Sequence, residues 1–332
     1  MGAMTAPARP QNDRAIDVSF VQAAGRLEGV VQRTPLRGLA HEQLELRLKL
    51  ECLQETGSFK ARGAWNQIAQ LTDAERKAGV VTTSSGNHGR ALAWAAGRAG
   101  VPATICMPGD AYPNKIQACR DLGAEVRLGE TRPETDAICR ELAAAGKTLI
   151  HPYDSLRTIE GAGTVGLEIA DEWPDVDVVV VPIGGGGLIS GVALALRDRL
   201  GKSVTIIGVE PAGAATMSLA LEAGHPVDLP EITTGVQGLC PLNVGVLNQQ
   251  VAAANVDRVV LIDDESVFRA QAKLVNEEGL VVEPAGAAAL AAVLYGDALV
   301  GLEKKRRIAV VVSGGNPAPE QLESIRRRKS EA

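Results

Sequence analysis

The chain has 332 residues, 45% of them hydrophobic, and its 34 basic and 40 acidic side chains give a net charge of -6. This length suits one large or two ordinary domains. The acidic balance disfavours a nucleic-acid partner, and no apolar run reaches the about 18 to 20 residues of a membrane span. Five dispersed cysteines without paired metal-ligand spacing are typical of a reducing compartment, so we expect a cytoplasmic protein.

The first elements follow residues 1–14, which we interpret as disordered or as a cloning tag. "LRLKLEC" (46–52) alternates apolar and charged residues and predicts a half-buried strand. Next, a Thr/Gly/Ser cluster opens a helix that carries Lys60. Helix-length segments then separate eight apolar runs: "GVVTT", "ATICM", "AEVRL", "TLIHP", "VDVVVVP", "VTIIGVE", "RVVLI" and "RIAVVV". This alternation predicts an α/β fold with open, twisted, mostly parallel sheets and helices on both faces.

Two segments refine this expectation. Val178 to Val181 have no polar interruption, which is typical of a central parallel strand buried on both faces. The predicted helix at 285–294 is apolar almost all round, so it is either an interior helix or a subunit contact. Because 332 residues exceed what one core usually supports, we expect two sheets.

Three glycine-rich turns each follow a predicted strand, where open α/β sheets bind their ligands. They are "TTSSGNHG" (82–89), "VPIGGGGLISG" (181–191) and "VVSGGN" (311–316). In the second turn, Gly184, Gly185, Gly186 and Gly187 expose backbone amides between a strand and a helix, as a phosphate site requires. The alternative is a tight crossover without a ligand, although one glycine usually suffices for that.

A dinucleotide site is the competing interpretation, because Glu210 closes the next strand at about the distance of a ribose-binding acid. The spacing disagrees, since the third glycine of G-x-G-x-x-G falls on Ile189 or Ser190. A nicotinamide-dependent dehydrogenase therefore stays as an alternative only.

The first and third turns supply polar groups. Amides, hydroxyls and one carboxamide at a helix start suit a carboxylate, and they come from Ser84, Ser85, Gly86, Asn87 and His88. In the third turn, Ser313 ends an apolar strand and offers one hydroxyl to a buried heteroatom. Two anion sites on two turns indicate a ligand with two anionic ends.

Lys60 is an unusual residue for the first turn of a helix, where the macrodipole disfavours a cation. The same dipole, helped by burial, favours loss of the ammonium proton, and a neutral amine can condense with an aldehyde. A phosphate cradle with a carbonyl-reactive lysine indicates pyridoxal phosphate bound as a Schiff base. The other interpretation of Lys60 is a surface lysine whose stem covers apolar residues.

Five ordered motifs, "TGSFKARGA", "SSGNHGRALAWAA", "GGGGLISG", "EPAGAAAL" and "SGGN", resemble the fold-type II pyridoxal-phosphate enzymes. Within them the chain is similar to the serine/threonine dehydratase (threonine ammonia-lyase) and serine racemase group, from about residue 17 to 316. The resemblance implies that Lys60 holds the cofactor and later acts as general base. It also implies cofactor contacts from Phe59, Asn87, Gly184 to Gly187, Leu188 and Ser313, with the substrate carboxylate held by Ser84 to His88.

The same resemblance makes Ser85 the acid/base residue on the face opposite the lysine in racemases, and it places Glu283 near the cofactor pocket. The chain also departs from the family. Thr216 stands where cation-binding members have an acidic residue, so we expect no metal site. The loop at 233–243, "TTGVQGLCPLN", replaces the usual Ala-Asp-Gly loop beside the substrate's side chain. We expect no regulatory domain after Ala332.

The sequence therefore predicts a small domain (56–154) inserted into a large cofactor-binding domain (1–55 and 155–332), in a homo-oligomer that acts on a small amino acid. The predicted reaction is β-elimination from a β-hydroxy amino acid, threonine or serine by default, giving a 2-oxo acid and ammonia. Alternatives within the family are a dehydratase for hydroxyaspartate-like substrates or hydroxyectoine catabolism, and an amino acid racemase. Outside it, a non-catalytic amino acid sensor stays open besides the dehydrogenase.

Overall fold

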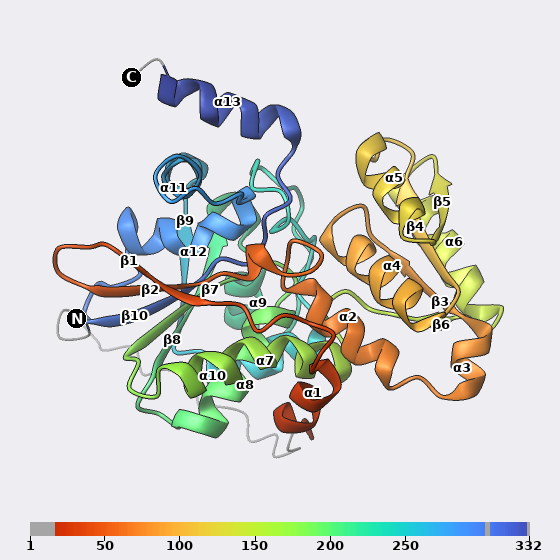
Figure 1. The fold of residues 1–332 in the computed structure, drawn as a ribbon, viewed down its shortest axis with the longest axis horizontal. Helices are drawn as coiled ribbons and strands as arrows, with labels where there is room; N and C mark the ends of the chain where they lie inside the picture. Colours follow the sequence, from red (N-terminus) through yellow and green to blue (C-terminus); the bar gives the residue numbers. More distant parts are fainter. Residues whose placement is uncertain (1–16, 303–305, 331–332) are drawn as a thin grey trace.

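The computed structural model describes residues 17–302 and 306–330, so the expectation for residues 1–14 lies outside the described part. The chain forms two sheets of unequal size, each flanked by helices, which lie side by side in Figure 1. No helix within the described ranges combines the length and apolar character that a bilayer crossing requires.

The larger sheet has six strands in the order β1-β2-β10-β7-β8-β9. Their bounds are β1 (Leu36–Leu39), β2 (Glu45–Lys49), β7 (Val178–Pro182), β8 (Thr205–Pro211), β9 (Arg258–Ile262) and β10 (Arg307–Val311). β1 runs antiparallel to β2, and the other neighbours are parallel. The helices of this part are α1 (Phe20–Leu27), α7 (Leu156–Glu172), α8 (Gly187–Leu200), α9 (Thr216–Ala223), α10 (Val246–Asn255), α11 (Asp264–Asn276), α12 (Pro284–Leu294) and α13 (Pro319–Ser330).

The smaller sheet has four parallel strands in the order β5-β4-β3-β6. Its strands are β3 (Val80–Thr83), β4 (Ala103–Pro108), β5 (Glu125–Gly129) and β6 (Thr148–Leu149), and its helices are α3 (Asp73–Ala78), α4 (Asn87–Ala99), α5 (Pro113–Asp121) and α6 (Arg132–Ala144). Helix α2 (Lys60–Ala69) contacts both α7 of the larger part and α4 of the smaller part. The helix that begins with Lys60 therefore bridges the two sheets.

The eight apolar runs predicted as strands are all strands, and the expectation of two mostly parallel sheets is confirmed. "LRLKLEC" forms β2, but its last strand residue Lys49 is fully buried, whereas the alternation predicted a charged outer face. β1 was not predicted, because "LRGL" is short and carries a glycine and an arginine. It lies at the sheet edge, where strands are often short.

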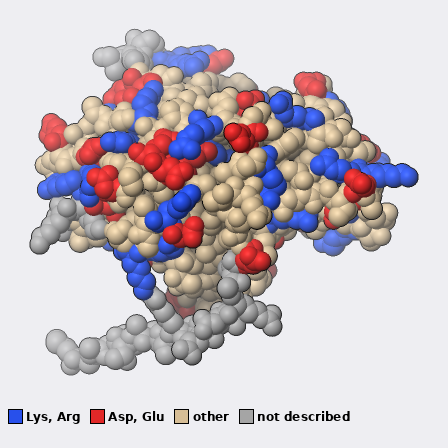
Figure 2. Space-filling model, turned by 60° about the horizontal axis from the view of Figure 1, so that its bottom comes forward, with Lys and Arg blue, Asp and Glu red and all other residues tan. Residues whose placement is uncertain are grey.

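The core confirms the central position of β7. Val178 and Val180 pack into one apolar cluster with α11 and α12, while Val179 and Val181 pack into another with α7 and α8. Helix α12 is buried on all sides within the chain from Pro284 to Val293, so of the two alternatives it is an interior helix. On the side of the molecule shown in Figure 2, acidic and basic side chains are interspersed.

Candidate active site

Lys60 lines a small cavity at the carboxyl end of β7, together with Phe59, the glycine turn and Ser313. Its Nζ donates a hydrogen bond of 2.7 Å to the Pro152 carbonyl and lies 4.9 Å from the centre of the Phe59 ring. Burial lowers the pKa of the Lys60 amine to about 8. The site therefore provides a lysine that is partly neutral near physiological pH, as the sequence predicted.

The glycine turn connects β7 to α8 and lies in the same cavity. Gly186 has φ of 94° and caps α8 without a side chain, which leaves the first amides of the helix open to a ligand. The turn is closely packed against other segments. A Cβ atom on Gly185 would lie 2.4 Å from the Tyr153 ring, and one on Gly186 would lie 2.6 Å from Cβ of Asn248. Close approach of the segments that carry Tyr153 and Asn248 therefore explains why Gly185 and Gly186 are glycines.

Ser313 follows β10 at the other side of this cavity and is 4% exposed. Its hydroxyl donates a hydrogen bond of 3.3 Å to the Ala285 carbonyl, and its own carbonyl accepts one from the Phe59 amide at 3.1 Å. An isolated bridge also pairs Ser58 with Gly314. The turn before Lys60 and the third glycine turn are thus held together although they lie far apart in the sequence.

The first turn opens α4 beside these groups. Ser84 Oγ accepts hydrogen bonds from the amides of Gly86 (3.2 Å) and Gly89 (3.1 Å), which shape the turn. Asn87 donates to Glu283 Oε1 at 2.6 Å and accepts from Asn316 at 2.7 Å. The carboxamide of Asn87 is therefore held in one orientation by the turns that follow β10 and precede α12.

The ring of His88 points into the protein and not toward a carboxylate. It is 4% exposed, and its Nε2 lies 3.1 Å from Thr82 Oγ1 and 3.2 Å from the Ile150 carbonyl. Burial, and next the charge of Lys60, lower the pKa of His88 to about 3. Only its backbone amide remains for the anion role that the sequence predicted.

Glu283 is buried beside Asn87, and burial raises the pKa of its carboxyl to about 7. A Cβ on Gly314 would lie 2.1 Å from Glu283 Oε1, so the glycine of the third turn makes room for this carboxyl group. The sequence placed Glu283 near the cofactor pocket, and here it contacts one of the predicted cofactor residues.

A larger pocket of about 570 Å³ adjoins the first turn. Its lining includes Ser84 and Ser85, the 240–243 part of the altered loop, and Arg132 and Arg140 of α6. The altered loop and the predicted carboxylate turn therefore face the same space.

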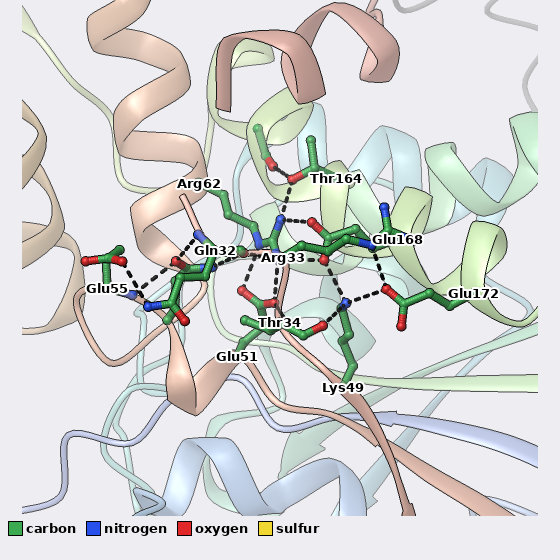
Figure 3. Close-up of polar contacts among 12 residues, drawn as sticks. Gln32, Arg33, Thr34, Lys49, Glu51, Glu55, Arg62, Thr164, Glu168 and Glu172 are labelled. Atoms are coloured by element: carbon green, nitrogen blue, oxygen red, sulfur yellow. Dashed lines mark hydrogen bonds and ion pairs between the residues drawn. The ribbon is translucent and has the colours of Figure 1, made fainter. Parts of the chain in front are cut away.

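The helix that carries Lys60 is fixed by a buried ion network (Figure 3). Arg62 donates to both oxygens of Glu51 at 2.8 Å and to Glu168 at 2.6 and 2.9 Å, and all three residues are buried. Lys49 lies 2.6 Å from Glu168 and donates to the Thr34 carbonyl at 2.6 Å. This network holds α2 against α7 and against the turn after β2. Its central residue, Arg62, lies two residues beyond Lys60.

Glu210, in β8, accepts hydrogen bonds from neighbouring protein groups. It accepts from Thr216 Oγ1 (3.1 Å), the Met217 amide (2.6 Å), and the amide and hydroxyl of Ser218 (2.9 and 2.8 Å). In the described residues, no group of three or more His, Cys, Asp or Glu is arranged to hold a metal ion. The Glu210 carboxylate thus accepts hydrogen bonds from the first turn of α9 and stabilises it.

Sequence reasoning missed the segment that connects the two sheets at 150–154. The Pro152 carbonyl contacts Lys60, and the Tyr153 ring lies against the glycine turn. Asn248 was also missed, although its amide donates to the carbonyls of Tyr153 (3.1 Å) and Gly185 (2.8 Å). The role of a backbone carbonyl cannot be read from a sequence, and an asparagine within a helix belongs to no recognisable motif.

Comparison with known proteins agrees with this geometry. Residues 27–314 match the model of the "Pyridoxal-phosphate dependent enzyme" family. The L-threonine ammonia-lyase of Thermotoga maritima is 40% identical over 89% of this chain and 74% of its own, and the catabolic L-threonine dehydratase TdcB of Escherichia coli K12 is 35% identical over 91% and 93%. The structure of maize serine racemase superposes with a TM-score of 0.86 at 34% identity, covering 94% of this chain and 97% of that one. The chain therefore belongs to the pyridoxal-phosphate-dependent enzymes and has their fold-type II architecture.

Proposed function

We propose that the chain catalyses β-elimination from a small β-hydroxy amino acid, threonine or serine, and releases a 2-oxo acid and ammonia. The observation that carries this proposal is the placement of Lys60. Its amine has a pKa lowered to about 8 and lines the cavity of the glycine turn. It also donates to the carbonyl of Pro152, a residue that lines the pocket of Ser84 and Ser85. The names of the relatives, threonine ammonia-lyase and threonine dehydratase, support the same reaction.

The donor set fits pyridoxal phosphate. The open amides from Gly184 to Leu188 suit a phosphate, the Lys60 amine suits an aldehyde, and the Ser313 hydroxyl suits a ring nitrogen. Phe59 would contact the ring, and Asn87 would donate to its phenolic oxygen. When bound, pyridoxal phosphate supplies an electron sink that acidifies the Cα proton of an amino acid.

The other roles belong to the residues of the chain. The turn from Ser84 to His88 would hold the substrate carboxylate through its amides and hydroxyls. The Lys60 amine, when free, would take the Cα proton of the substrate as general base. The loop at 240–243 borders the space for the substrate's side chain.

The test is product formation by the cofactor-loaded protein. We expect release of a 2-oxo acid and ammonia in equal amounts from L-threonine or L-serine. A loaded protein that binds these amino acids with a change in cofactor absorbance but forms no product would contradict the proposal and favour the amino acid sensor. Membership in the pyridoxal-phosphate family removes the reason for a nicotinamide cofactor.

An acidic β-hydroxy amino acid is the second candidate substrate, favoured by Arg132. This arginine lines the same pocket as Ser85, and within the described ranges it makes no ion pair. A second carboxylate on the substrate could pair with it. A higher kcat/KM for 3-hydroxyaspartate than for threonine, lost in Arg132→Ala but kept in Arg98→Ala on α4, would establish this substrate class.

Racemisation stays a third possibility within the family because Ser85 lines the pocket. If the protein racemises serine, Ser85→Ala should abolish that activity while elimination continues. Racemisation that survives this change would contradict the assignment of Ser85 as the second acid/base group.

We further propose that residues 56–154 form a small domain that closes on the large one around the substrate, in a cytoplasmic homo-oligomer. Five free thiols support a reducing compartment. Exposed apolar side chains on and near α11 and α12, namely Phe268, Val281 and Tyr295, support a subunit contact. Light scattering after gel filtration tests the oligomeric state.

A further inference from the structure

The crossover segment, residues 150–154, runs from the smaller sheet to α7 and contacts several parts of the site. The Ile150 carbonyl lies 3.2 Å from His88 Nε2, and the Pro152 carbonyl accepts from Lys60 at 2.7 Å. The Tyr153 carbonyl accepts from Asn248, which also holds the Gly185 carbonyl of the glycine turn. The position of this segment thus affects both the lysine and the phosphate turn.

Asp154, at the end of the crossover segment, caps a helix that lies far away in the sequence. Its Oδ2 accepts from the Val246 amide at 3.1 Å and its Oδ1 from the Leu247 amide at 3.0 Å, at the start of α10. The residue at the N-cap position of α10 is Gly245, which has no side chain to do this. A carboxylate at a helix N-terminus satisfies free amides and opposes the positive end of the dipole.

The surrounding residues are shaped for this contact. A Cβ on Gly245 would lie 2.4 Å from the Asp154 carboxylate carbon, so a glycine is needed there. The Gly245 amide in turn donates to the Gly185 carbonyl at 3.2 Å. The next residues of α10 complete the connection, because Asn248 joins the Tyr153 and Gly185 carbonyls. The first turn of α10 therefore joins the crossover segment to the glycine turn.

We propose that Asp154 is a positioning residue for the cofactor site. By capping α10 it holds the crossover segment in register with the glycine turn, so that the Pro152 carbonyl meets Lys60 and the amides of the turn stay aligned for a phosphate. The inference goes beyond the proposed function, because it concerns cofactor binding and does not depend on which amino acid is the substrate.

The test compares the affinity of the full, cofactor-stripped chain for pyridoxal phosphate in three variants. Asp154→Ala should raise the dissociation constant at least tenfold. Val246→Pro removes one of the two amides without breaking α10, because proline is favoured at the first helical position and Gly245 has the extended ψ of 150° that a following proline requires. We expect this variant to raise the dissociation constant two- to tenfold.

Thr72→Ala is the matched control. It removes the cap of α3, where Thr72 Oγ1 accepts from the Glu75 amide at 3.3 Å, in an exposed part of the chain. It should lower the melting temperature as a lost cap does, but leave the dissociation constant within twofold of the parent value. A merely structural role for Asp154 would move only the melting temperature.

The inference is overturned if Asp154→Ala folds and binds the cofactor within twofold of the parent. Should Asp154→Ala fail to fold, Val246→Pro decides, and an unchanged dissociation constant in that variant overturns the inference. A parent chain that binds no pyridoxal phosphate would overturn the proposed function as well. A parent that binds pyridoxal phosphate tightly and forms no product would contradict the proposed function. The role of Asp154 would still be supported if Asp154→Ala raised the dissociation constant.

Discussion

At the scale of single residues, the chemistry of the site depends on the protonation of Lys60. Its pKa is lowered by burial to about 8, so the neutral, nucleophilic amine becomes the major form only above that pH. We expect the rate of covalent attachment of pyridoxal phosphate, trapped with borohydride, to fall about tenfold for each pH unit below 8 and to level off above it. An ordinary exposed lysine would still gain reactivity up to about pH 10.4.

Lys60→Ala provides the complementary result. This variant should show no cofactor attached after borohydride and less than a few per cent of parent turnover, with an unchanged fold by circular dichroism. The control is Lys202→Ala, which changes an exposed lysine after α8. Peptide mapping that finds the reduced cofactor on another lysine, or substantial turnover in Lys60→Ala, would contradict the assignment.

His88 makes stability depend on pH. Its pKa is about 3 in the folded protein, against about 6.5 for an unfolded chain, so between these values the unfolded state binds more protons. The contribution of His88 to the free energy of unfolding is therefore fully present above about pH 6.5. It falls as the pH drops, by up to about 1.4 kcal/mol per pH unit.

His88→Gln tests this contribution, since a glutamine amide can keep the contacts with Thr82 and Ile150 without titrating. We expect urea unfolding between pH 6.5 and 4 to show a shallower loss of stability in this variant. His225→Gln, which changes an exposed histidine, should leave the pH slope of the parent unchanged. Equal slopes in the parent and His88→Gln would show that the ring is not buried in its neutral form.

Sequence reasoning at this scale relied on residue types that carry their own chemistry. Lys60 at a helix start, the four glycines and Ser313 were predicted, and the structure brings them to one cavity. For His88 the sequence predicted only a place in the carboxylate turn, and a histidine at a helix start gives no sign of whether its ring faces solvent or core. The Pro152 carbonyl and Asp154 were missed because their roles depend on neighbours 92 residues away.

At the scale of elements, the most demanding position is Arg62 in α2. Burial on its own raises the pKa of Glu51, but the charge and hydrogen bonds of Arg62 outweigh it, so the pKa of Glu51 is lowered and the carboxylate stays ionised. Arg62→Met would leave the carboxylates of Glu51 and Glu168 without this partner (Figure 3). Breaking a buried pair in this way costs about 3 to 5 kcal/mol.

Urea unfolding measures this cost. Lys273→Ala, which removes an exposed pair with Glu277 at the C-terminal end of α11, should cost about 0.5 kcal/mol or less and serves as the control. The double variant Arg62→Met with Glu51→Gln should recover part of the loss, because one uncompensated charge is removed. A loss below about 1 kcal/mol in Arg62→Met would mean that α2 is held mainly by its apolar contacts.

The elements themselves were the most predictable part of the molecule. Uninterrupted apolar runs such as Val178 to Val181 identify strands because burial on both faces leaves no room for polar side chains. The edge strand β1 and the burial of Lys49 were not predictable, since both depend on which segments lie alongside. From the sequence alone, a lysine paired inside a core cannot be distinguished from a solvated one.

At the scale of the whole molecule, the predicted cofactor residues belong to both halves of the structure. Gly184 to Leu188 and Ser313 follow strands of the larger sheet, whereas Asn87 begins a helix of the smaller part and Lys60 begins the bridging helix α2. A ligand that contacts both parts in the native state and neither in the unfolded state should stabilise them together. With free pyridoxal phosphate at a hundredfold excess over its dissociation constant, the gain is about 2.7 kcal/mol.

The three tryptophans make this measurable for each half separately. The ring centroids of Trp65 and Trp94 lie 6.1 Å apart, and both rings pack on the core of the smaller sheet. Trp173 packs in the core of the larger sheet. Trp65 also donates to the Arg26 carbonyl of α1, so the double variant Trp65→Phe with Trp173→Phe leaves Trp94 as the reporter for the smaller part. The double variant Trp65→Phe with Trp94→Phe leaves Trp173 as the reporter for the larger part. Comparing each variant with and without cofactor cancels the cost of the substitution itself.

We expect the cofactor to shift the urea unfolding curves of both reporters by the same free energy. Such an equal shift requires that the two cores unfold as one cooperative unit when the cofactor is present, because a ligand stabilises only the unit that must open to release it. A shift seen by Trp173 but not by Trp94 would place the binding energy on the larger sheet alone. The contacts proposed for Asn87 would then contribute nothing to holding the cofactor, and closure of the small domain would have to be driven by the substrate carboxylate at the turn from Ser84 to His88.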